Sequence, residues 1–416
     1  MWLYSIKATN RMTEKMIAAL KDNTAAQVSA YRNMQVAAHG NVQATTQVTA
    51  QVTATRTGNV TQHVRCVSAS APVPSLTCQP HDSLVEQERC MPERSMCVQT
   101  RETCIECSAC TRACSFLTKY DLNLKDFTNR PDLRYSCFMC DRCKAVCPVD
   151  LSGNRIAYEL RAARPQDTWF TSFWKTSYKL RNNSPVQSKT LLFLGCNYPG
   201  YLPKTSARMI ELCESYGIDF SIDCCKKPVH DSGCTPNMHP LDALFARKGV
   251  ERVICCCPNC FHFLRTRYPA LQIMDPYEFL TEIGFTSTIH EEVHVYFPCS
   301  ERFDRTIYEH IKPFAPKRCE QTFRAIECCG AGGGAYKREP ELVRATHARV
   351  NSMNAANMYT YCSTCAGMFH AGGVKRVKNF LSEILGVHEV PSTHYARNVS
   401  AFKLRKHRVG GRCVHG

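Results

Sequence analysis

The spacing of apolar residues predicts alternating strands and helices in the C-terminal half of the chain. Short apolar runs at 191–195, 218–222 and 250–254 are typical of buried strands, and apolar residues at helical spacing separate the first two runs. A similar run at 293–297 starts the pattern again. Strands and helices that alternate at these lengths predict an α/β fold made of three-layer units, with functional residues in the loops after the strands.

Cysteines recur in the same order in both parts of this pattern. Each part has a single Cys, an adjacent Cys-Cys pair and a Cys-x2-Cys motif, and the second set follows the first by 103, 104 and 105 residues. A nearly constant offset predicts two tandem copies of one unit, repeat 1 (191–290) and repeat 2 (291–392). The candidate ligands are Cys196, Cys224, Cys225, Cys257 and Cys260 in repeat 1, and Cys299, Cys328, Cys329, Cys362 and Cys365 in repeat 2.

The remaining segments lack this pattern. Residues 1–98 include a tract rich in Gln, Thr, Val and Ala (41–61), whose composition buries little apolar surface and predicts a low-complexity, disordered extension. Aromatic residues at helical spacing within 166–190 predict a linker helix with a packing face. Residues 393–416 are predicted to form a basic tail.

The cysteine content bears on the compartment, because the chain has 28 cysteines among 416 residues. Disulfide-rich proteins are short and secreted, and they lack clustered motifs of this kind. The sequence has no apolar run of the kind found in signal peptides or membrane-spanning helices. We therefore expect a cytoplasmic protein with reduced, metal-bound thiols, which has no transmembrane segment of its own and reaches a membrane only through a partner.

The formal net charge of +16 at first favours a nucleic-acid-binding protein. The thiolates of metal-bound cysteines add negative charge that the formal value omits, so this value overstates the positive charge of the loaded protein. The excess that remains lies partly in the run 403–408, where base-stacking aromatic residues are not interleaved with the charges. Binding to nucleic acid is therefore not expected.

Two further cysteine motifs occupy the segment 99–165, each with the spacing Cys-x2-Cys-x2-Cys-x3-Cys. This spacing bends consecutive thiolates around one iron cube, and in two-cluster proteins the fourth Cys of each run binds the cluster of the other run. We therefore expect two [4Fe–4S] sites. Site A comprises Cys104, Cys107, Cys110 and Cys147, and site B comprises Cys114, Cys137, Cys140 and Cys143.

The residue after each of these runs differs. Pro148 follows the second run and turns the chain away, whereas Ser115 follows the first run and leaves its thiols intact. Two zinc sites are the alternative, because Cys-x2-Cys is also a zinc motif. Zinc sites seldom use the full quartet twice with a trailing Pro. The segment resembles two-cluster ferredoxin domains over about 50 residues, which implies a small helical module with two [4Fe–4S] clusters.

The two repeats resemble the cysteine-rich CCG domain found in the B and D subunits of heterodisulfide reductase. The resemblance rests on the sequences FLGC (193–196), CPNC (257–260), CCGAGGG (328–334) and CSTC (362–365). The same domain occurs in the C subunit of anaerobic glycerol-3-phosphate dehydrogenase, in glycolate oxidase iron–sulfur subunits and in lactate-utilisation proteins. Together with the ferredoxin-type module, the resemblance covers roughly 100–390, in the order found in the D subunit of heterodisulfide reductase.

This resemblance implies one or two further [4Fe–4S] clusters, cubane or noncubane, held by five cysteines in each repeat. At such a site a disulfide is cleaved in two one-electron steps. Glycines after Cys329 allow the backbone to come close to the cluster and to direct N–H groups at its sulfides. A phosphate-binding loop is the alternative for these glycines, but no Lys-Ser/Thr follows them.

Repeat 1 departs from the family pattern. Lys226 and Lys227 follow Cys225 where the family has Gly or Pro, and two extra thiols, Cys255 and Cys256, precede Cys257. Either repeat could therefore hold a cubane cluster or use a different subset of ligands. A lysine beside a cluster raises its potential, which suits repeat 1 to relaying electrons. Repeat 2 keeps the pattern, so the substrate chemistry is assigned to Cys299, Cys328, Cys329, Cys362 and Cys365.

The resemblance implies an iron–sulfur oxidoreductase of the heterodisulfide reductase type, acting as a subunit of a complex. The first alternative is a non-catalytic electron-transfer subunit of a flavin-dependent glycerol-3-phosphate, glycolate or lactate-type dehydrogenase that passes electrons to quinone. The second alternative is a redox-sensing or interaction protein whose clusters are structural. The sequence has no flavin or nicotinamide fingerprint, so we expect a flavoprotein or a membrane cytochrome or quinone-reactive subunit as partner.

Overall fold

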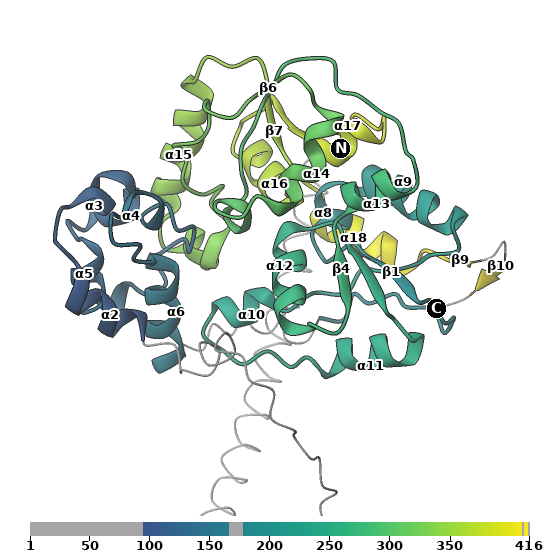
Figure 1. Ribbon diagram of the computed structural model, residues 1–416, viewed down its shortest axis with the longest axis horizontal. Coiled ribbons are helices and arrows are strands. Elements are labelled where there is room, and N and C mark those ends of the chain that lie inside the picture. The colour runs from purple at the N-terminus through teal and green to yellow at the C-terminus, as the bar shows by residue number, and fades with distance from the viewer. Residues whose placement is uncertain (1–94, 166–177, 410–411, 415–416) are drawn as a thin grey trace, which may run out of the picture. The chain divides into compact units, whose positions relative to one another are not determined.

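The computed structural model describes residues 95–165, 178–409 and 412–414, and their fold is mixed α/β (Figure 1). Contacts divide the chain into 1–83 and 84–416, and all described residues belong to the second unit. The extension predicted at 1–98 lies almost entirely outside the described residues, as does the aromatic part of the linker helix predicted at 166–190.

Residues 178–189, at the end of that predicted linker, contain no helix. Their polar side chains bond instead to distant parts of the chain. Asn183 donates to Asp223 at 2.7 Å, and Ser184 donates to Asp219 at 2.6 Å. Pro185 has no N–H to donate, so a helix could not continue through this segment without losing a hydrogen bond.

The segment 99–165, which the sequence predicts to be ferredoxin-type, is a small helical module. Its helices are α2 (Met96–Thr103), α3 (Ala109–Ala113), α4 (Ser115–Lys119), α5 (Leu124–Phe127) and α6 (Gly153–Ala163), with 3-10 turns η2 (Pro131–Leu133) and η3 (Lys144–Val146). Helix α2 begins before the boundary expected at 99, because Glu159 of α6 accepts hydrogen bonds from the backbone N–H groups of Met96 (2.6 Å) and Cys97 (2.9 Å). Phe116 and Ile156 are part of the buried core of the module.

Repeat 1 contains a four-stranded parallel sheet with the strand order β2-β1-β3-β4. Its elements are β1 (Thr190–Phe193), α8 (Tyr198–Tyr201), α9 (Pro203–Ser215), β2 (Asp219–Ser221), α10 (Lys227–Asp231), α11 (His239–Lys248), β3 (Arg252–Cys255), α12 (Pro258–Arg267), β4 (Gln272–Met274) and α13 (Pro276–Glu282). In the central strand, Leu192 is fully buried and lies opposite Phe220 and Ile254. A parallel strand that is covered on both faces needs apolar residues on both, which explains the continuous apolar runs.

Repeat 2 has shorter strands and the same strand order. Its elements are β5 (Val293–His294), η4 (Cys299–Glu301), α14 (Thr306–Ile311), η5 (Lys312–Phe314), β6 (Arg318–Cys319), η6 (Gly332–Lys337), α15 (Pro340–Ser352), β7 (Met358–Thr360), α16 (Ser363–Ala371), β8 (Val377–Asn379) and α17 (Phe380–Ile384). Strand β5 pairs with β6 and β7 pairs with β8, all parallel, and a bridge between Val295 and Tyr359 joins the two pairs. The resulting order β6-β5-β7-β8 corresponds to β2-β1-β3-β4 in repeat 1.

The segment predicted as a basic tail folds against repeat 1. Helix α18 (Tyr395–Lys403) packs on α8, and β9 (His407–Val409) pairs with β10 (Arg412–Val414) and lies beside β2. His407 is fully buried, stacks on Phe220 with ring centroids 4.1 Å apart, and places Nδ1 2.6 Å from Asp219. Buried Lys248 forms an ion pair with the same carboxylate. Part of the basic character of this segment therefore serves internal pairing.

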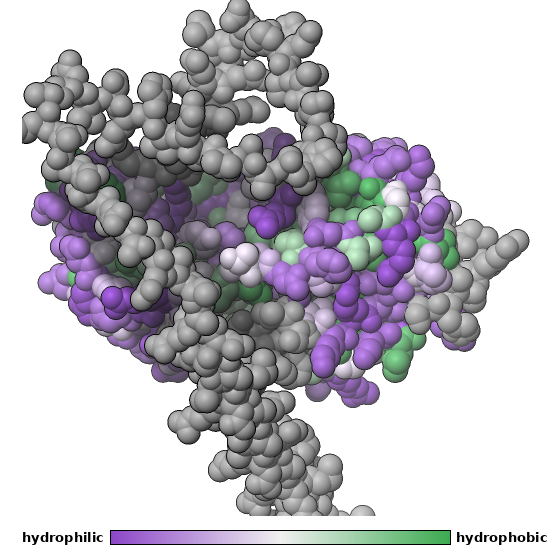
Figure 2. All heavy atoms as spheres, turned by 90° about the horizontal axis from the view of Figure 1, so that it is seen from below, coloured by the Kyte–Doolittle hydropathy of each residue, from purple (hydrophilic) through white to green (hydrophobic). Residues whose placement is uncertain are grey.

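One hydrophobic core extends from repeat 1 into repeat 2 and includes Ile254, Leu264, Val295 and Tyr361. The two repeats are therefore packed as a single body. The face seen in Figure 2 is mostly hydrophilic, with hydrophobic side chains in small separate areas. Within the described ranges, no helix combines the length and apolar character needed to cross a bilayer.

Candidate iron–sulfur sites

The structure brings the four cysteines expected at site A together. Cys104, Cys107, Cys110 and Cys147 line one small cavity beside helix α3. Cys110 is buried, whereas Cys107 is exposed, so site A lies close to the protein surface. A cluster in this position would be accessible to a partner protein.

Site B is more deeply buried than site A. Cys137, Cys140 and Cys143 are buried and Cys114 is half-buried. Burial, together with the neighbouring thiol of Cys114, raises the pKa of Cys143 well above its ordinary value. Gly153 leaves room for this ligand, since a Cβ there would lie 2.6 Å from the Sγ of Cys143. A metal bound at site B would displace the protons of these thiols and offset the repulsion between the negative charges of their thiolates.

The loops of both sites contain strained residues at equivalent positions. Glu106 and Ser108 follow the first Cys of one run and have φ values of +54° and +56°. Met139 and Asp141 stand at the same positions after the first Cys of the other run, and both have φ values of +53°. Left-handed backbone costs a non-glycine residue about 1–2 kcal/mol. Strain that is repeated in both loops is typical of a functional, ligand-wrapping conformation.

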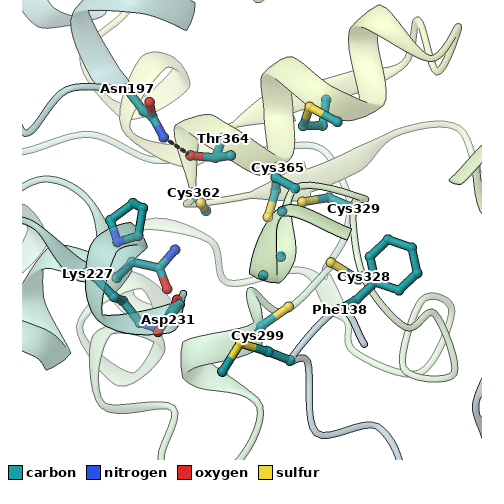
Figure 3. Close-up of a pocket in the computed structure, with 18 of the residues that line it drawn as sticks. Phe138, Asn197, Lys227, Asp231, Cys299, Cys328, Cys329, Cys362, Thr364 and Cys365 are labelled. Atoms are coloured by element: carbon teal, nitrogen blue, oxygen red, sulfur yellow. Dashed lines mark hydrogen bonds and ion pairs between the residues drawn. The ribbon is translucent and has the colours of Figure 1, made fainter. Parts of the chain in front are cut away.

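The cysteines of the two repeats line a single cavity of about 1000 Å³, here called the cysteine cavity (Figure 3). Nine of the ten candidates line it: Cys196, Cys225, Cys257, Cys260, Cys299, Cys328, Cys329, Cys362 and Cys365. The tenth, Cys224, is buried beside Cys225. The sequence predicts a separate set of ligands for each repeat, whereas in the structure cysteines of both sets line the same cavity.

Hydrogen bonds between thiols cross from one repeat to the other. The thiols of Cys257 and Cys365 lower the pKa of Cys362 well below its ordinary value. In repeat 2, the thiols of Cys328 and Cys365 lower the pKa of Cys329 to about 6. Thiolates are the form of Cys that binds metals, and soft thiolate donors select iron–sulfur clusters, zinc or copper(I). Hydrogen bonds to Cys329 and Cys362 raise the pKa of Cys365, and the hydrogen bond to Cys362 and burial raise that of Cys257, so thiolates alternate with thiols along the wall. The cavity therefore offers soft sulfur donors to a metal centre.

A half-buried ion pair forms another part of the cavity wall. Lys227 donates to Asp231 at 2.6 Å, and both residues line the cavity. Burial alone lowers the pKa of Lys227, but the charges of Asp231, Cys225 and Cys299 raise it above its ordinary value. The second lysine after Cys225 thus places a positive charge between cysteines of the two repeats.

The residue after each Cys-Cys pair has a left-handed backbone. Lys226 has φ +69° and Gly330 has φ +101°. The CCG domain that the sequence resembles has Gly or Pro where Lys226 stands, and this lysine adopts the glycine-type conformation in spite of its side chain. The two repeats therefore share this turn although the residue differs.

The glycines after Cys329 allow repeat 2 to contact the loop of site B. A Cβ on Gly332 would lie 2.1 Å from the carbonyl oxygen of Phe138 and 3.1 Å from the Sγ of Cys328. A Cβ on Gly333 would lie 2.9 Å from the carbonyl oxygen of Cys137. The glycine run thus brings the backbone close both to a cysteine of the cavity and to the loop of site B.

Sequence reasoning missed Arg161, which is fully buried on α6 and joins three parts of the chain. Its guanidinium donates to the carbonyl oxygens of Cys137 (2.9 Å), Asp231 (2.7 Å) and Gly333 (3.1 Å). These acceptors belong to site B, repeat 1 and repeat 2. A signal was available, because an arginine among the apolar positions of α6 needs buried partners, but the sequence does not reveal which partners.

Other cysteines lie away from the candidate sites. Cys213, Cys255 and Cys256 are buried in the hydrophobic core of repeat 1, and Cys319 lies on β6. The extra thiols before Cys257 therefore pack in the core and are not part of the cavity wall. Their burial accounts for them without a metal.

No protein-family model matches the chain. The chain is 24% identical over 277 residues to an uncharacterised iron–sulfur protein of Methanococcus maripaludis and 24% identical over 275 residues to one of Methanocaldococcus jannaschii; each match covers 56% of both proteins. It is 22% identical over 274 residues to the B subunit of fumarate reductase (CoM/CoB) from Methanothermobacter marburgensis, covering 56% of this chain and 55% of that protein. The chain therefore spans about half the length of the curated relatives it matches.

Two of these relatives are named as iron–sulfur proteins and the third as a subunit of a fumarate reductase, and together they support an iron–sulfur redox role for this chain. With the clustered cysteines, they also support bound iron–sulfur clusters. A crystal structure of a hypothetical protein from Helicobacter pylori has 12% sequence identity and a TM-score of 0.43, covering 78% of this chain and 77% of that one.

Proposed function

We propose that the chain is an iron–sulfur oxidoreductase subunit of the heterodisulfide reductase type, which reduces a disulfide in the cysteine cavity. The observation that carries this proposal is the meeting of nine cysteines from two repeats around one cavity. Sites A and B would each hold a [4Fe–4S] cluster, and the cavity would hold one or two more, cubane or noncubane. The corresponding strand orders of repeats 1 and 2 support their origin as tandem copies.

The donor groups of the cavity fit an iron–sulfur group. Among the described residues that line it, there are nine cysteines, one carboxylate (Asp231) and no histidine. The backbone N–H of Gly330 lies 3.3 Å from the Sγ of Cys328, a contact of the kind that tunes cluster sulfurs. Zinc sites often include histidine, so a wall whose metal-binding groups are almost all thiols favours iron–sulfur over zinc.

The proposed reaction converts a disulfide, two electrons and two protons into two thiols, with the electrons supplied by a redox partner protein. Clusters bound at the sites would supply the electrons one at a time. The chain itself would hold the disulfide between the repeats, whose walls are joined by a hydrogen bond from Asn197 to Thr364 at 2.5 Å. Lys227 would stabilise the negative charge of a thiolate as the S–S bond breaks. The five cysteines of repeat 2 keep their proposed catalytic assignment.

A second candidate is an electron-transfer subunit that has no substrate of its own. Two observations favour it: Cys107 is exposed at site A, and one relative is named as a subunit of a fumarate reductase. Under this proposal the cavity would hold relay clusters only. Both candidates require a partner, for which we propose a flavoprotein or a membrane cytochrome or quinone-reactive subunit.

The experiment that separates these candidates is reduction of a panel of small disulfides by the anaerobically purified full chain, with reduced viologen dye as electron donor. The first proposal predicts disulfide reduction that is lost in Cys365→Ala and kept in Cys319→Ser, a control on β6 away from the cavity. If the chain contains reducible clusters but reduces none of the disulfides above the rate without protein, the electron-transfer candidate is favoured instead.

A further inference from the structure

Besides Arg161, two further polar contacts join repeat 2 to site B, and Arg302 makes the first of them. Arg302 directly follows η4, the short helix that begins at Cys299, and is half-buried. Its Nε donates to the carbonyl oxygen of Cys140 at 3.0 Å, and its Nη2 donates to the carbonyl oxygen of Glu327. Arg302 therefore connects a cysteine of site B to the residue that precedes Cys328.

Glu327 makes the second contact through its side chain. Its buried carboxylate accepts hydrogen bonds from the backbone N–H of Ser115 at 3.2 Å and from the Oγ of Ser115 at 2.6 Å. Ser115 follows Cys114 of site B, whereas Pro follows the last Cys of the other run. Proline has neither of these donors. The departure from the ferredoxin pattern at Ser115 thus creates a contact with repeat 2.

Apolar packing reinforces the two polar contacts. Phe138 and Cys140 from the loop of site B belong to the same buried cluster as Cys328 and Cys329 of repeat 2. Gly332 places its backbone directly against Phe138. The loop of site B therefore packs on the Cys-Cys pair of repeat 2.

Arg302 also adds a fixed positive charge at this contact. Its guanidinium remains protonated in proteins and interacts with the thiols of Cys140, Cys299 and Cys328. Its side-chain hydrogen bonds go to site B and repeat 2, and none of those described go to site A. Because a cluster becomes more negative on reduction, a nearby positive charge favours the reduced form and raises the reduction potential.

We propose that Arg302 is a positioning residue that fixes site B against the Cys299–Cys328 end of the cysteine cavity and raises the reduction potentials of the groups bound at both. This inference rests on the proposed function, because it requires iron–sulfur clusters at these sites. Because Arg302 would fix site B next to Cys299 and Cys328, electrons that leave site B would reach repeat 2 before repeat 1. The sequence alone suggests the opposite order of electron transfer. It predicts that the lysine after Cys225 raises the potential of a cluster in repeat 1, which would make repeat 1 the relay.

The test is a redox titration followed by EPR on the full chain, purified anaerobically, for wild type, two variants of Arg302 and one control variant. Arg302→Gln removes the charge, so the potential of site B should become more negative while that of site A stays unchanged. Arg302→Lys keeps the charge, so site B should stay closer to the wild-type potential. Arg305→Gln is the matched control, because Arg305 pairs with Glu320 at 3.0 Å and stacks on Phe297, and it should shift neither site.

Four outcomes would overturn the proposal. Equal potentials in wild type and Arg302→Gln, or an equal shift at sites A and B, would overturn it while leaving the proposed function intact. Absence of ferredoxin-type signals from the wild type would overturn both. If Arg302→Gln fails to assemble, Arg302→Lys provides the test. Lysine cannot form the forked hydrogen bonds of arginine, so Arg302→Lys should weaken the magnetic interaction between site B and the cavity group. An unchanged magnetic interaction would contradict the positioning role.

Discussion

The thiols of Cys257 and Cys362 are hydrogen-bonded neighbours, although 105 residues separate them and they belong to different repeats. Each is the first Cys of a Cys-x2-Cys motif and the N-cap of a helix, α12 for Cys257 and α16 for Cys362. Two helix N-termini therefore meet at the cavity. The hydrogen bond between the two thiols lowers the pKa of Cys362, whereas the pKa of Cys257, although lowered by Cys260, is raised overall by Cys362 and by burial, so Cys362 is the thiolate of this pair. The ligand sets of the two repeats therefore form one continuous group.

Replacing either of these two cysteines should disturb the same metal centre. We expect Cys257→Ser and Cys362→Ser each to lower the iron content of the cavity, while the EPR signals of sites A and B remain, because their ligand sets are independent. Iron analysis and EPR of the anaerobically purified variants, with Cys319→Ser as control, test this. Loss of every cluster would show that the segment with sites A and B and the two repeats assemble as one metal-dependent unit. Loss of iron in only one of the two variants would show that Cys257 and Cys362 do not bind the same metal centre.

The close approach of Gly332 to Phe138 can be tested with a pair of alanine substitutions. Gly332→Ala places a Cβ 2.1 Å from the carbonyl oxygen of Phe138, so the loops must move apart, at a cost of about 1–3 kcal/mol. Gly334→Ala is the control, because its φ is +71° but no atom lies within 4 Å of the added Cβ, and it should cost only about 1 kcal/mol of backbone strain. Urea unfolding of the anaerobic proteins measures both. Equal midpoints would contradict the contact.

Restoring the ferredoxin-type proline at position 115 should destabilise the protein. Ser115 is the first residue of α4, and Cys114 before it has φ −125° and ψ 113°, so the backbone accepts Pro. The carboxylate of Glu327 loses both Ser115 donors, at a cost of about 1–3 kcal/mol. Ser115→Ala loses only the hydroxyl and should cost less. A Ser115→Pro variant whose unfolding midpoint matches that of the wild type would show that this contact is energetically unimportant.

His310 should make stability depend on pH near neutrality. The hydrogen bond to Asp275, at 2.6 Å, raises the pKa of His310, although partial burial lowers it. A raised folded-state pKa adds stability that is fully present below the ordinary value of about 6.5 and is lost as pH rises through the folded value. The unfolding free energy should therefore fall as pH rises above about 6.5, and it should fall less in His310→Gln. Identical pH slopes in the two proteins would rule out this linkage.

Local sequence patterns were sufficient for the parts of the fold whose partners are near in the chain. The apolar runs at 191–195, 218–222 and 250–254 coincide with β1, β2 and β3. The cysteines expected at site A lie around one cavity. Three of them share the Cys-x2-Cys-x2-Cys spacing, and only Cys147 comes from a more distant part of the chain. The run at 293–297 gave only a two-residue strand followed by a bridge at Val295.

The contacts that decide how the parts meet could not be read from local patterns. The contact between Cys257 and Cys362 depends on how the two repeats pack on each other. The periodicity of apolar residues along the sequence does not encode that packing. Arg161 and Arg302 act through backbone carbonyl groups, which every residue has, so no sequence motif marks their partners. The segment 393–416 reads as a basic tail because composition does not reveal that His407 is buried against Asp219.

The most direct test of the shared cysteine cavity is the metal content of the anaerobically purified full chain, measured together with inorganic sulfide. Clusters in sites A, B and both halves of the cavity predict roughly 14–16 iron atoms per chain. The same measurement on Cys362→Ser should return a value nearer eight, the content of two [4Fe–4S] clusters. A wild-type value of about eight would mean that the cysteine cavity binds no iron, and stoichiometric zinc in place of iron would contradict the account altogether.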